Sequence, residues 1–310
     1  MISILIPTYN YTCLTLVKTL QQQGEQLCQS EHMTNFRYEI LVADDCSTQQ
    51  NTIKNNLEIN RIENCTYTLL PQNIGRAAIR NWLANQATYD YLLFIDSDAQ
   101  VCSAHFLADY WNAVKPISSN TDRPETPAVV CGGLRNVSFC PGKKYALRFT
   151  YEADADKRRS ASQRSKNPYA QFSTFNFLIA RNIFCSIGFN EQCKHYGYED
   201  VYFGMELKKK QISICHIDNP LIHLGIDTNL EFLNKTETAL KTLHSLDDEI
   251  KEHVLIAHTA EQLRKIHLLV FCNRLFPVFR PLLRRNLLGP HPSLFLFKLY
   301  KLGFYAHIKE

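Results

Sequence analysis

The sequence lacks the short signatures that identify several large enzyme classes. It contains neither a Gly-x-Gly-x-x-Gly motif nor a Gly-Lys-Ser/Thr phosphate loop, which argues against a dinucleotide dehydrogenase and a P-loop phosphotransferase. Its eleven cysteines are scattered without a Cys-x-x-Cys pair, so neither a zinc site nor a small disulfide scaffold is indicated. A nucleotide bound here would therefore be held by carboxylates, and at its phosphates by arginine and a metal ion.

Long hydrophobic runs are also missing. The longest uncharged apolar runs, near the C-terminus, fall short of the ~18 residues that a membrane span needs. The apolar run at residues 2–6 is too short for the hydrophobic region of a signal peptide, so we expect none. Many cysteines lie inside apolar runs, which suits buried, reduced thiols. We therefore expect a cytoplasmic protein.

Charge is divided unevenly along the chain. The 310 residues are 45% hydrophobic and 21% charged, which is typical of a globular protein with one large domain and an appendage. Of the net charge of +4, residues 262–310 contribute nine Lys/Arg and one acid, or +8, which leaves −4 for residues 1–261. We expect a catalytic domain at 1–227 and a helical, basic extension at 228–310. In the extension, Thr228 or Asn229 can cap a helix through Leu246, and Asp247 can start a second helix that includes Ala257.

Apolar stretches of strand length alternate with stretches of helical spacing in the first third of the chain. The strands are expected at 2–6, 38–43, 67–70 and 91–95, with helices at 14–24, at 52–62 and around 80–82. This alternation predicts an α/β fold with a mostly parallel sheet flanked by helices. Because parallel strands end at one edge, the polar residues that follow them should meet at one rim: Thr8, Asp44, Asp45, Arg76, Asp96 and Asp98.

Asp96-Ser97-Asp98 directly follows the fourth predicted strand. Hard cations such as Mg²⁺ and Mn²⁺ take carboxylate oxygens and share their remaining positions with substrate phosphates. Two aspartates after a strand are, however, more often a solvated turn. The interpretation of this motif as a metal site therefore depends on the other motifs of the chain.

Four motifs in order resemble those of family 2 glycosyltransferases with the GT-A fold. They lie at residues 4–10, 42–48, 73–81 and 94–98, and the resemblance extends over about 1–225. It implies inverting transfer of a sugar from a nucleotide-diphosphate sugar. The implied donor site consists of Pro7, Thr8, Tyr9, Asp44, Asp45, Asn73, Arg76, Asp96, Ser97 and Asp98.

The resemblance also assigns roles within this site. Asp44 or Asp45 is expected at the nucleobase or ribose, Asp98 on the metal, and Asp96 on the ribose or metal. Cys46 stands where the family commonly has glycine, which leaves the local turn open.

Glu199-Asp200 opens a predicted helix, where acidic side chains would complement the helix dipole and cap exposed amides. In the family resemblance, the pair looks like the Glu-Asp motif. Asp200 is then the general base, and Glu199 contacts a sugar hydroxyl. Inverting transfer needs one such base at the acceptor hydroxyl, whereas glycoside hydrolysis needs two carboxyl groups. Tyr198 replaces the commoner tryptophan or glycine, so the acceptor subsite is undefined.

His223 follows the Glu-Asp helix on a short predicted strand. A lone histidine in an alternating strand is usually a satisfied core residue. Its position nevertheless resembles that of the metal-binding histidine in several GT-A enzymes. The resulting hypothesis is that Asp98, His223 and Asp96 hold Mn²⁺ or Mg²⁺, with diphosphate oxygens completing the coordination.

Two segments allow alternative interpretations. Residues 150–171 are polar and basic, and form either a solvated loop or a lid over donor and acceptor. Beyond residue 264, bulky apolar residues are mixed with arginines and with prolines at 277, 281, 290 and 292. This tail either packs on the catalytic domain or lies on the anionic inner face of a membrane. The prolines are expected to interrupt any long helix.

The sequence therefore predicts a metal-dependent, inverting glycosyltransferase of the hexosyl or N-acetylhexosaminyl class. The expected donor is a UDP-sugar and the expected acceptor a glycan or lipid-linked glycan, in the assembly of a surface polysaccharide. The alternatives are an inactive GT-A-fold carbohydrate-binding or scaffold protein and a nucleotide-sugar pyrophosphorylase, whose Gly-rich signature is missing. Nucleic acid is not an expected partner, because the basic tail lacks a recognition motif.

Overall fold

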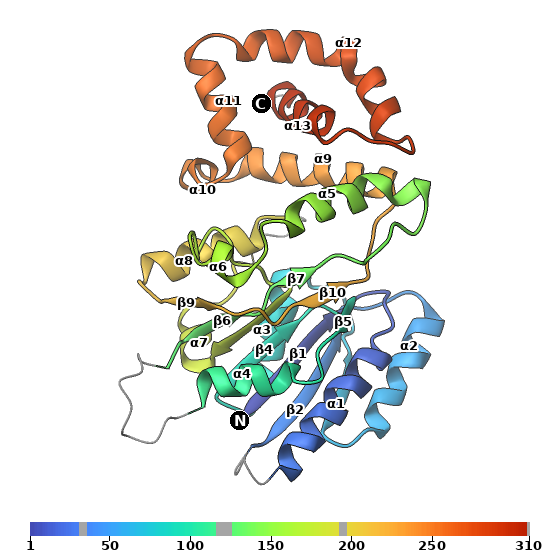
Figure 1. Cartoon of the computed structure of the whole chain (residues 1–310), viewed down its shortest axis with the longest axis vertical. Coiled ribbons are helices and arrows are strands. Elements are labelled where there is room, and N and C mark those ends of the chain that lie inside the picture. Colours follow the sequence, from blue (N-terminus) through green and yellow to red (C-terminus); the bar gives the residue numbers. More distant parts are fainter. Residues whose placement is uncertain (31–35, 116–125, 192–196, 309–310) are drawn as a thin grey trace. The chain divides into compact units, whose positions relative to one another are not determined.

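The computed structural model describes residues 1–30, 36–115, 126–191 and 197–308 (Figure 1). These residues form two compact units, which are described separately. The first comprises 1–135, 159–194 and 203–224, and the second 136–158, 195–202 and 225–310. The second unit takes in two segments of the predicted catalytic domain, so the boundary at residue 227 remains a proposal.

The first unit is built on a seven-stranded sheet of order β3-β2-β1-β4-β8-β6-β9. Strands β3, β2, β1 and β4 run parallel, β8 is antiparallel to β4 and β6, and β9 is parallel to β6. The bounds are β1 Ile2–Thr8, β2 Tyr38–Asp44, β3 Cys65–Leu69, β4 Tyr91–Ile95, β6 Val129–Cys131, β8 Asn176–Ala180 and β9 Ile214–His216. The predicted, mostly parallel α/β sheet is thus confirmed.

A small second sheet has the strand order β5-β10-β7, and its strand β5 follows β4 closely along the chain. Its strands are β5 Ala99–Val101, β7 Leu134–Arg135 and β10 Leu221–His223. Strand β10 runs antiparallel to β5, with His223 opposite Ala99. Because Ala99 directly follows Asp98, this strand pairing places His223 close to Asp98.

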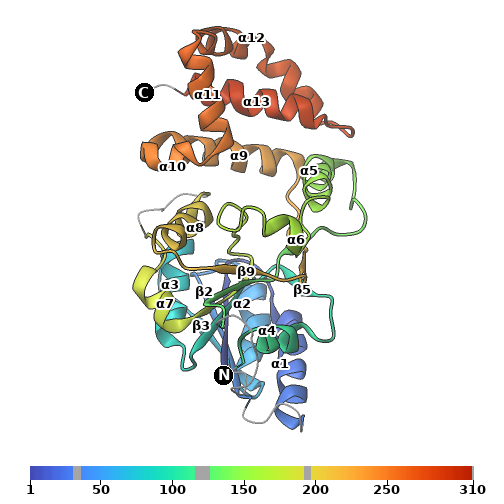
Figure 2. The same ribbon diagram turned by 60° about the vertical axis from the view of Figure 1, so that its left-hand side comes forward.

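Helices cover both faces of the large sheet (Figures 1 and 2). Along β1, Ile2, Ile4 and Ile6 pack in one core with α1 Leu14–Gln29 and α4 Phe106–Val114. Leu5 points to the opposite core, which α3 Arg76–Gln86 and α7 Arg181–Ile187 cover. Successive strand residues face opposite sides, so a strand buried on both faces reads as a continuous apolar run.

Two sequence expectations need correction, one in this unit and one over a segment divided between the two units. The helix expected at 52–62 is α2 Gln50–Leu57 followed by a 3₁₀ turn, Glu58–Arg61. The solvated loop expected over 150–171 is wrong, because the segment contains α5 Ala146–Asp156 and α6 Ala161–Arg164. Arg164 is buried, and its guanidinium donates to the carbonyl oxygens of Cys131, Gly132 and Ile217 at 2.7–3.1 Å. The several N–H groups of the Arg164 guanidinium satisfy carbonyl groups near strand ends. The polar character of the local sequence does not predict this burial. Whether part of this segment acts as a lid remains a prediction.

The second unit is helical. Its helices are α5, α9 Asn229–Ser245, α10 Asp248–Glu252, α11 Leu255–Lys265, α12 Leu269–Leu287 and α13 Leu294–His307, and it also holds the start of α8 Glu199–Lys209. Thr228 caps α9 in a reciprocal capping box with Glu231, which confirms that expected helix start. Phe276 of α12 packs on Tyr300 and Phe304 of α13.

Two expectations for this unit are wrong. The single helix expected from Asp247 through Ala257 is broken, because Val254 adopts an extended conformation between α10 and α11. Pro277 and Pro281 do not interrupt α12, which continues for 19 residues. Both prolines are exposed, so the carbonyl groups that lose a hydrogen-bond partner can turn to water.

Within the described segments, no single helix is long and apolar enough to cross a membrane. Helices α11 and α12 meet such a criterion only together, as a pair bent by 116°.

Candidate functional site

The loops after β1 and β2 are joined by Asn10. Its side-chain oxygen accepts hydrogen bonds from the backbone amides of Thr48 and Gln49 at 2.9 and 3.1 Å, and the Asn10 backbone amide donates to the Ser47 hydroxyl at 2.7 Å. Asn10 has a φ of 50°, a conformation that asparagine tolerates better than most residues. The buried Thr8 hydroxyl donates to the Tyr11 carbonyl oxygen at 3.0 Å.

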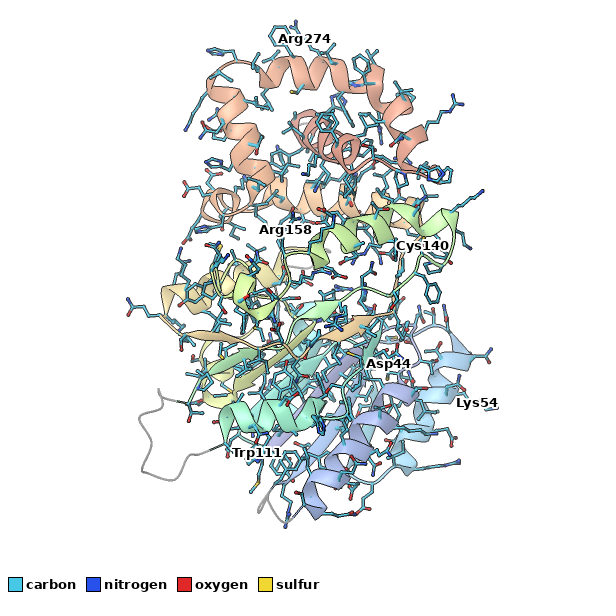
Figure 3. All side chains as sticks on the ribbon, viewed as in Figure 1. Asp44, Lys54, Trp111, Cys140, Arg158 and Arg274 are labelled. Carbon is cyan, nitrogen blue, oxygen red and sulfur yellow. The ribbon has the colours of Figure 1, made fainter. Side chains whose placement is uncertain are left out.

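The predicted nucleoside contacts Asp44 and Asp45 both hold these loops. Asp44, labelled in Figure 3, is fully buried and accepts from the Ser47 amide and the Tyr67 hydroxyl, each at 2.7 Å. Burial, and then this bond to Asp44, raises the pKa of Tyr67. Asp45 accepts from the backbone amides of Ile74 and Gly75, at 2.7 and 3.0 Å. Their predicted contact with the nucleobase or ribose remains a proposal.

Cys46, between Asp45 and Ser47, has a φ of 62°. This left-handed conformation suits glycine and costs other residues roughly 1–2 kcal/mol. The glycine that is common at this position in the family thus has a conformational reason, and this chain accepts strain there.

The loop after β3 and the start of α3 contribute two predicted residues, Asn73 and Arg76. The Asn73 side-chain amide donates to the Asp45 carbonyl oxygen at 2.9 Å, and Gly75, with a φ of 88°, precedes the helix. Arg76 is the first residue of α3, and its positive charge acts on Asp98. Pro7 lies within β1, and Tyr9 is exposed just beyond it. The expected grouping of the β1, β2 and β3 loops is therefore present.

Asp96, at the end of β4, forms an ion pair with Arg80 of α3. The distance from Nη2 to Oδ1 is 2.5 Å, and the Arg80 side chain is only 3% exposed. Arg80 also donates to the carbonyl oxygen of Arg76 at 3.1 Å and lies over the Phe189 ring at 5.8 Å. One oxygen of Asp96 is therefore engaged by arginine, and its predicted contact with ribose or metal remains a proposal.

Asp98 lies next to His223, as the metal-site hypothesis requires. His223 Nε2 is 3.1 Å from Asp98 Oδ2, and the Asp98 and His223 side chains retain 26% and 13% exposure. The His223 and Phe175 rings pack in a T-shaped arrangement, with ring centroids 5.3 Å apart. Burial acts to raise the pKa of Asp98, but the hydrogen bond and charge of His223 and the charge of Arg76 hold that pKa below its ordinary value. Asp98 is thus an ionised carboxylate with an imidazole at its side.

Tyr11 belongs to the same surroundings. Burial, followed by the negative charge of Asp98, raises the pKa of its hydroxyl. Among the residues that the structure describes, no three His, Cys, Asp or Glu side chains form a ready-made metal cluster. A cation held by Asp98 and His223 would therefore need further ligands from a bound substrate.

Glu199 and Asp200 are the first two residues of α8 and belong to the second unit. Asp200 accepts a hydrogen bond from the Val201 amide at 2.8 Å, and Glu199 is buried. Tyr198, with a φ of 71°, precedes them, and burial chiefly raises the pKa of its hydroxyl. The helix start is as predicted, and the roles of Asp200 as base and Glu199 as sugar contact remain proposals.

Comparison with known proteins gives a family match over about the first third of the chain. Residues 3–108 match the family model described as glycosyl transferase family 2. The resemblance to family 2 glycosyltransferases is confirmed. No curated protein sequence matches the chain.

Among the similar solved structures, two with a TM-score of 0.50 support the GT-A fold of this chain. Mannosyltransferase PcManGT from Pyrobaculum calidifontis, in complex with GDP-Man and Mn²⁺, has a TM-score of 0.50 and 14% identity. The match covers 78% of this chain and 62% of that one. A mycobacterial protein matches with a TM-score of 0.50 and 13% identity, over 79% of this chain and 74% of the other. S. aureus TarS 1–349 matches over 90% and 73%, with 19% identity and a TM-score of 0.49.

Three residues that position this site were not predicted from the sequence. Arg80 holds Asp96, Asn10 joins two loops, and Tyr11 lies near Asp98. A signal for Arg80 existed, because it stands one helical turn after Arg76 and therefore on the same side of α3. Asn10 is the last residue of the first family motif and Tyr11 follows it, and the local sequence does not indicate that Asn10 contacts the loop after β2.

Proposed function

We propose that this chain transfers a sugar, with inversion, from a nucleotide-diphosphate sugar to a hydroxyl of a glycan or lipid-linked acceptor. A UDP-sugar is the proposed donor, and the transferase is proposed to be of the hexosyl or N-acetylhexosaminyl class. The contact between Asp98 and His223, in a chain whose residues 3–108 match family 2, is the observation that carries this proposal. The proposed setting is cytoplasmic assembly of a surface polysaccharide.

The donor set at Asp98 fits a divalent cation. A carboxylate oxygen and an imidazole nitrogen are suitable ligands for Mn²⁺, and the diphosphate of a donor would supply the others. Asp98 is kept ionised by its neighbours, so no proton has to leave it before a cation binds. When bound, the cation would stabilise the charge of the departing diphosphate. PcManGT was solved with Mn²⁺ and GDP-Man, which supports the choice of Mn²⁺ as the first ion to test.

The protein's own residues divide the remaining tasks. Arg76 adds positive charge near Asp98, where donor phosphates would lie. The loops held by Asp44 and Asp45 are proposed to receive the nucleoside. Asp200 is proposed to take the proton of the acceptor hydroxyl as that oxygen attacks the anomeric carbon, with Glu199 holding a sugar hydroxyl.

Calorimetric titration of the full chain with UDP, GDP and CDP, with and without Mn²⁺, tests the donor site. We expect one nucleotide to bind in a Mn²⁺-dependent manner. Asp98→Ala and His223→Ala should each remove that dependence and weaken binding at least about tenfold. His105→Ala is the matched control, because His105 is an exposed histidine of the same unit.

Two results would overturn parts of this proposal. If His223→Ala leaves the metal dependence unchanged, His223 is not a metal ligand. If no nucleotide binds under any condition, a carbohydrate-binding or scaffold protein without turnover becomes the better interpretation. Once a nucleotide is identified, Asp200→Asn should retain its binding but abolish sugar transfer, as expected for a base that acts only on the acceptor.

A further inference from the structure

Helix α12 has two apolar faces, and only one of them is packed. On the packed face, Phe276, Leu283 and Leu287 follow one another at helical spacing and join the core formed with α13. Phe276 is 4% exposed. Gly303 of α13 approaches so closely that an added Cβ would lie 2.4 Å from the Phe276 ring. This face is therefore fully engaged within the second unit.

A second side of α12 presents five further apolar side chains to solvent. We name them the α12 outer face: Phe271, Leu275, Val278, Phe279 and Leu282. Their spacing of i, i+4, i+7, i+8 and i+11 places them in one stripe along the helix. Each is exposed, from 49% for Phe279 to 71% for Val278. A stripe of large exposed side chains, in contrast to a single one, indicates an interaction surface.

Two exposed arginines border this stripe. Arg274 precedes Val278 by four residues, and Arg285 follows it by seven, so all three lie along one line of the helix. Figure 3 shows Arg274 on the side of α12 away from α13. Over the part of the chain that the structure describes, neither arginine forms an ion pair, whereas Arg280 and Arg284 both pair with Glu237.

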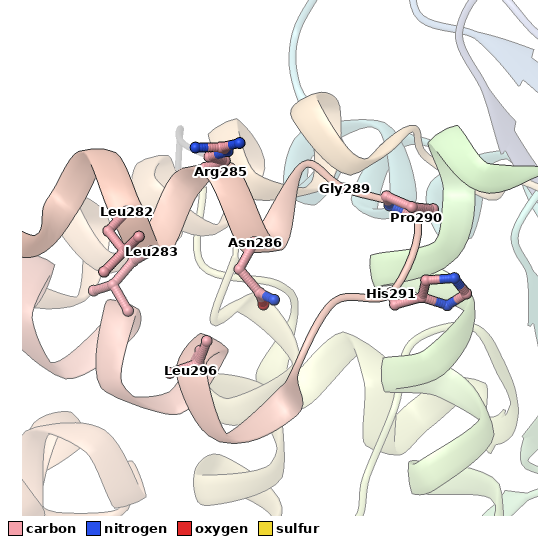
Figure 4. A pocket seen from close by; sticks show the side chains of 8 residues that line it. All are labelled: Leu282, Leu283, Arg285, Asn286, Gly289, Pro290, His291 and Leu296. Carbon is pink, nitrogen blue, oxygen red and sulfur yellow. The ribbon is translucent and has the colours of Figure 1, made fainter.

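An open pocket adjoins the end of the stripe. It has a volume of about 580 Å³, and Leu282, Leu283 and Leu296 converge on it, with Arg285 at its border (Figure 4). His291 lies at the other side of the pocket. The pocket therefore combines apolar side chains with Arg285 and His291, just as the stripe combines apolar side chains with arginines.

A second copy of the chain is a poor occupant of this surface. In a two-fold contact between two α12 outer faces, the same residues of both copies would meet. Arg274 and Arg285 would then oppose their own copies. The sequence from 262 to 310 offers nine Lys/Arg and one acid, Glu310, so compensating charge within this region is scarce.

We propose that the α12 outer face lies in the interfacial region of a membrane that contains anionic lipid. Its helix would lie in the membrane plane, with the five apolar side chains among the acyl chains and Arg274 and Arg285 at the lipid phosphates. Such a surface supplies apolar contact and negative charge together, which matches both properties of the stripe. The proposal concerns the second unit alone and does not depend on the nucleotide site.

Vesicle flotation of the full chain tests the apolar part of this surface. We expect binding to vesicles of phosphatidylcholine mixed equally with phosphatidylglycerol, and little binding to phosphatidylcholine alone. Phe271→Ser/Phe279→Ser should weaken binding at least about tenfold. The matched control, Leu57→Ser/Phe139→Ser, removes exposed apolar side chains elsewhere and should bind like the unmodified protein.

The charged part has its own matched pair of variants. Arg274→Gln/Arg285→Gln should weaken binding roughly tenfold or more, and high salt should have a similar effect. Lys18→Gln/Lys54→Gln removes the same net charge from exposed positions of the first unit and should leave binding unchanged.

A spectroscopic measurement locates the inserted residue. In Phe279→Trp, brominated lipid should quench the new tryptophan but not Trp82 or Trp111, which belong to the first unit. Equal binding to neutral vesicles, equal losses in the matched controls, or no added quenching would each overturn the proposal. So would failure to bind vesicles together with a dimer that Phe271→Ser/Phe279→Ser dissociates, because the surface would then join two copies.

Discussion

Removing the charge of Asp96 should destabilise the first unit more than any exposed charge change. Asp96→Asn keeps the shape of the side chain but leaves the Arg80 guanidinium without its anionic partner. Arg80 is 3% exposed, and its Nε is buried without a hydrogen-bond partner among the described residues. Water therefore has little access to the charge that the substitution leaves behind.

The size of the effect follows from the burial of the two partners. Removing one member of a buried ion pair costs about 3–5 kcal/mol. The Asp96 side chain is 23% exposed, and asparagine can still accept a hydrogen bond, so we expect about 3 kcal/mol. Arg80→Met should cost less, about 1–2 kcal/mol, because the unpaired Asp96 can turn toward water. The double variant should cost less than the sum of the single variants, by about 1–3 kcal/mol.

Urea denaturation followed by tryptophan fluorescence measures these free energies in the right part of the molecule. The two tryptophans, Trp82 and Trp111, both belong to the first unit. With a slope of about 1–3 kcal/mol per molar urea, Asp96→Asn should lower the midpoint by about 1 M or more.

An exposed ion pair of the same unit supplies the control. Arg61 and Glu58 are 78% and 47% exposed, so Glu58→Gln should change the unfolding free energy by no more than about 0.5 kcal/mol. The reasoning is refuted if Asp96→Asn and Glu58→Gln shift the midpoint equally, or if the Asp96 and Arg80 substitutions are additive.

Three further substitutions test separate features of the first unit. Arg164 Nη1 is 2.6 Å from His216 Nδ1, and because a guanidinium only donates, the folded ring must be neutral there. Burial chiefly lowers the pKa of His216, so the folded state binds fewer protons than the unfolded state at this residue. The free energy of unfolding should therefore fall as pH drops below 6.5, by at most about 1.4 kcal/mol per pH unit. His216→Gln should remove this pH dependence from the urea midpoint, whereas His105→Gln should leave it in place. Cys46→Gly should raise the unfolding free energy by roughly 0.5–1 kcal/mol, because relief of the left-handed strain exceeds the added entropy of the unfolded chain, and an unchanged or lower midpoint would contradict this. Asp45→Asn should lower the unfolding free energy by about 1–2 kcal/mol, since it weakens the carboxylate bonds to two backbone amides at the start of α3, and a midpoint equal to that of the unmodified protein would contradict this.

The strands of the first unit were predictable because each one reads locally. Buried strands at 2–8, 38–44 and 91–95 are mostly apolar, and a polar cluster marks where each ends. The contact between Asp98 and His223 has no such local signal, since 125 positions separate the two residues. Only the pairing of β10 with β5 brings them together, and the family resemblance supplied that expectation in place of the residue pattern.

The failed expectations share a physical cause. Arg164 lies in a polar stretch that reads as solvated, yet tertiary contacts with three carbonyl groups bury it. Pro277 and Pro281 read as helix breakers, yet α12 continues because its packed face holds it against α13 and its prolines face solvent. In both cases packing outweighs the local preference, which a single sequence does not reveal.

The acidic residues that the sequence groups together separate by burial into two kinds. Asp44 and Asp45 are almost completely buried, and their oxygens hold backbone amides and a tyrosine hydroxyl. Asp98 and His223 retain exposure, and their main contact is with each other. Substituting the buried pair should therefore reduce stability and nucleotide binding together, whereas Asp98→Ala should reduce binding with little change in the urea midpoint. A loss of nucleotide binding without a loss of stability would identify Asp98 as a ligand-binding residue. A loss of both would identify Asp45 as a residue that holds the loops of the site in place.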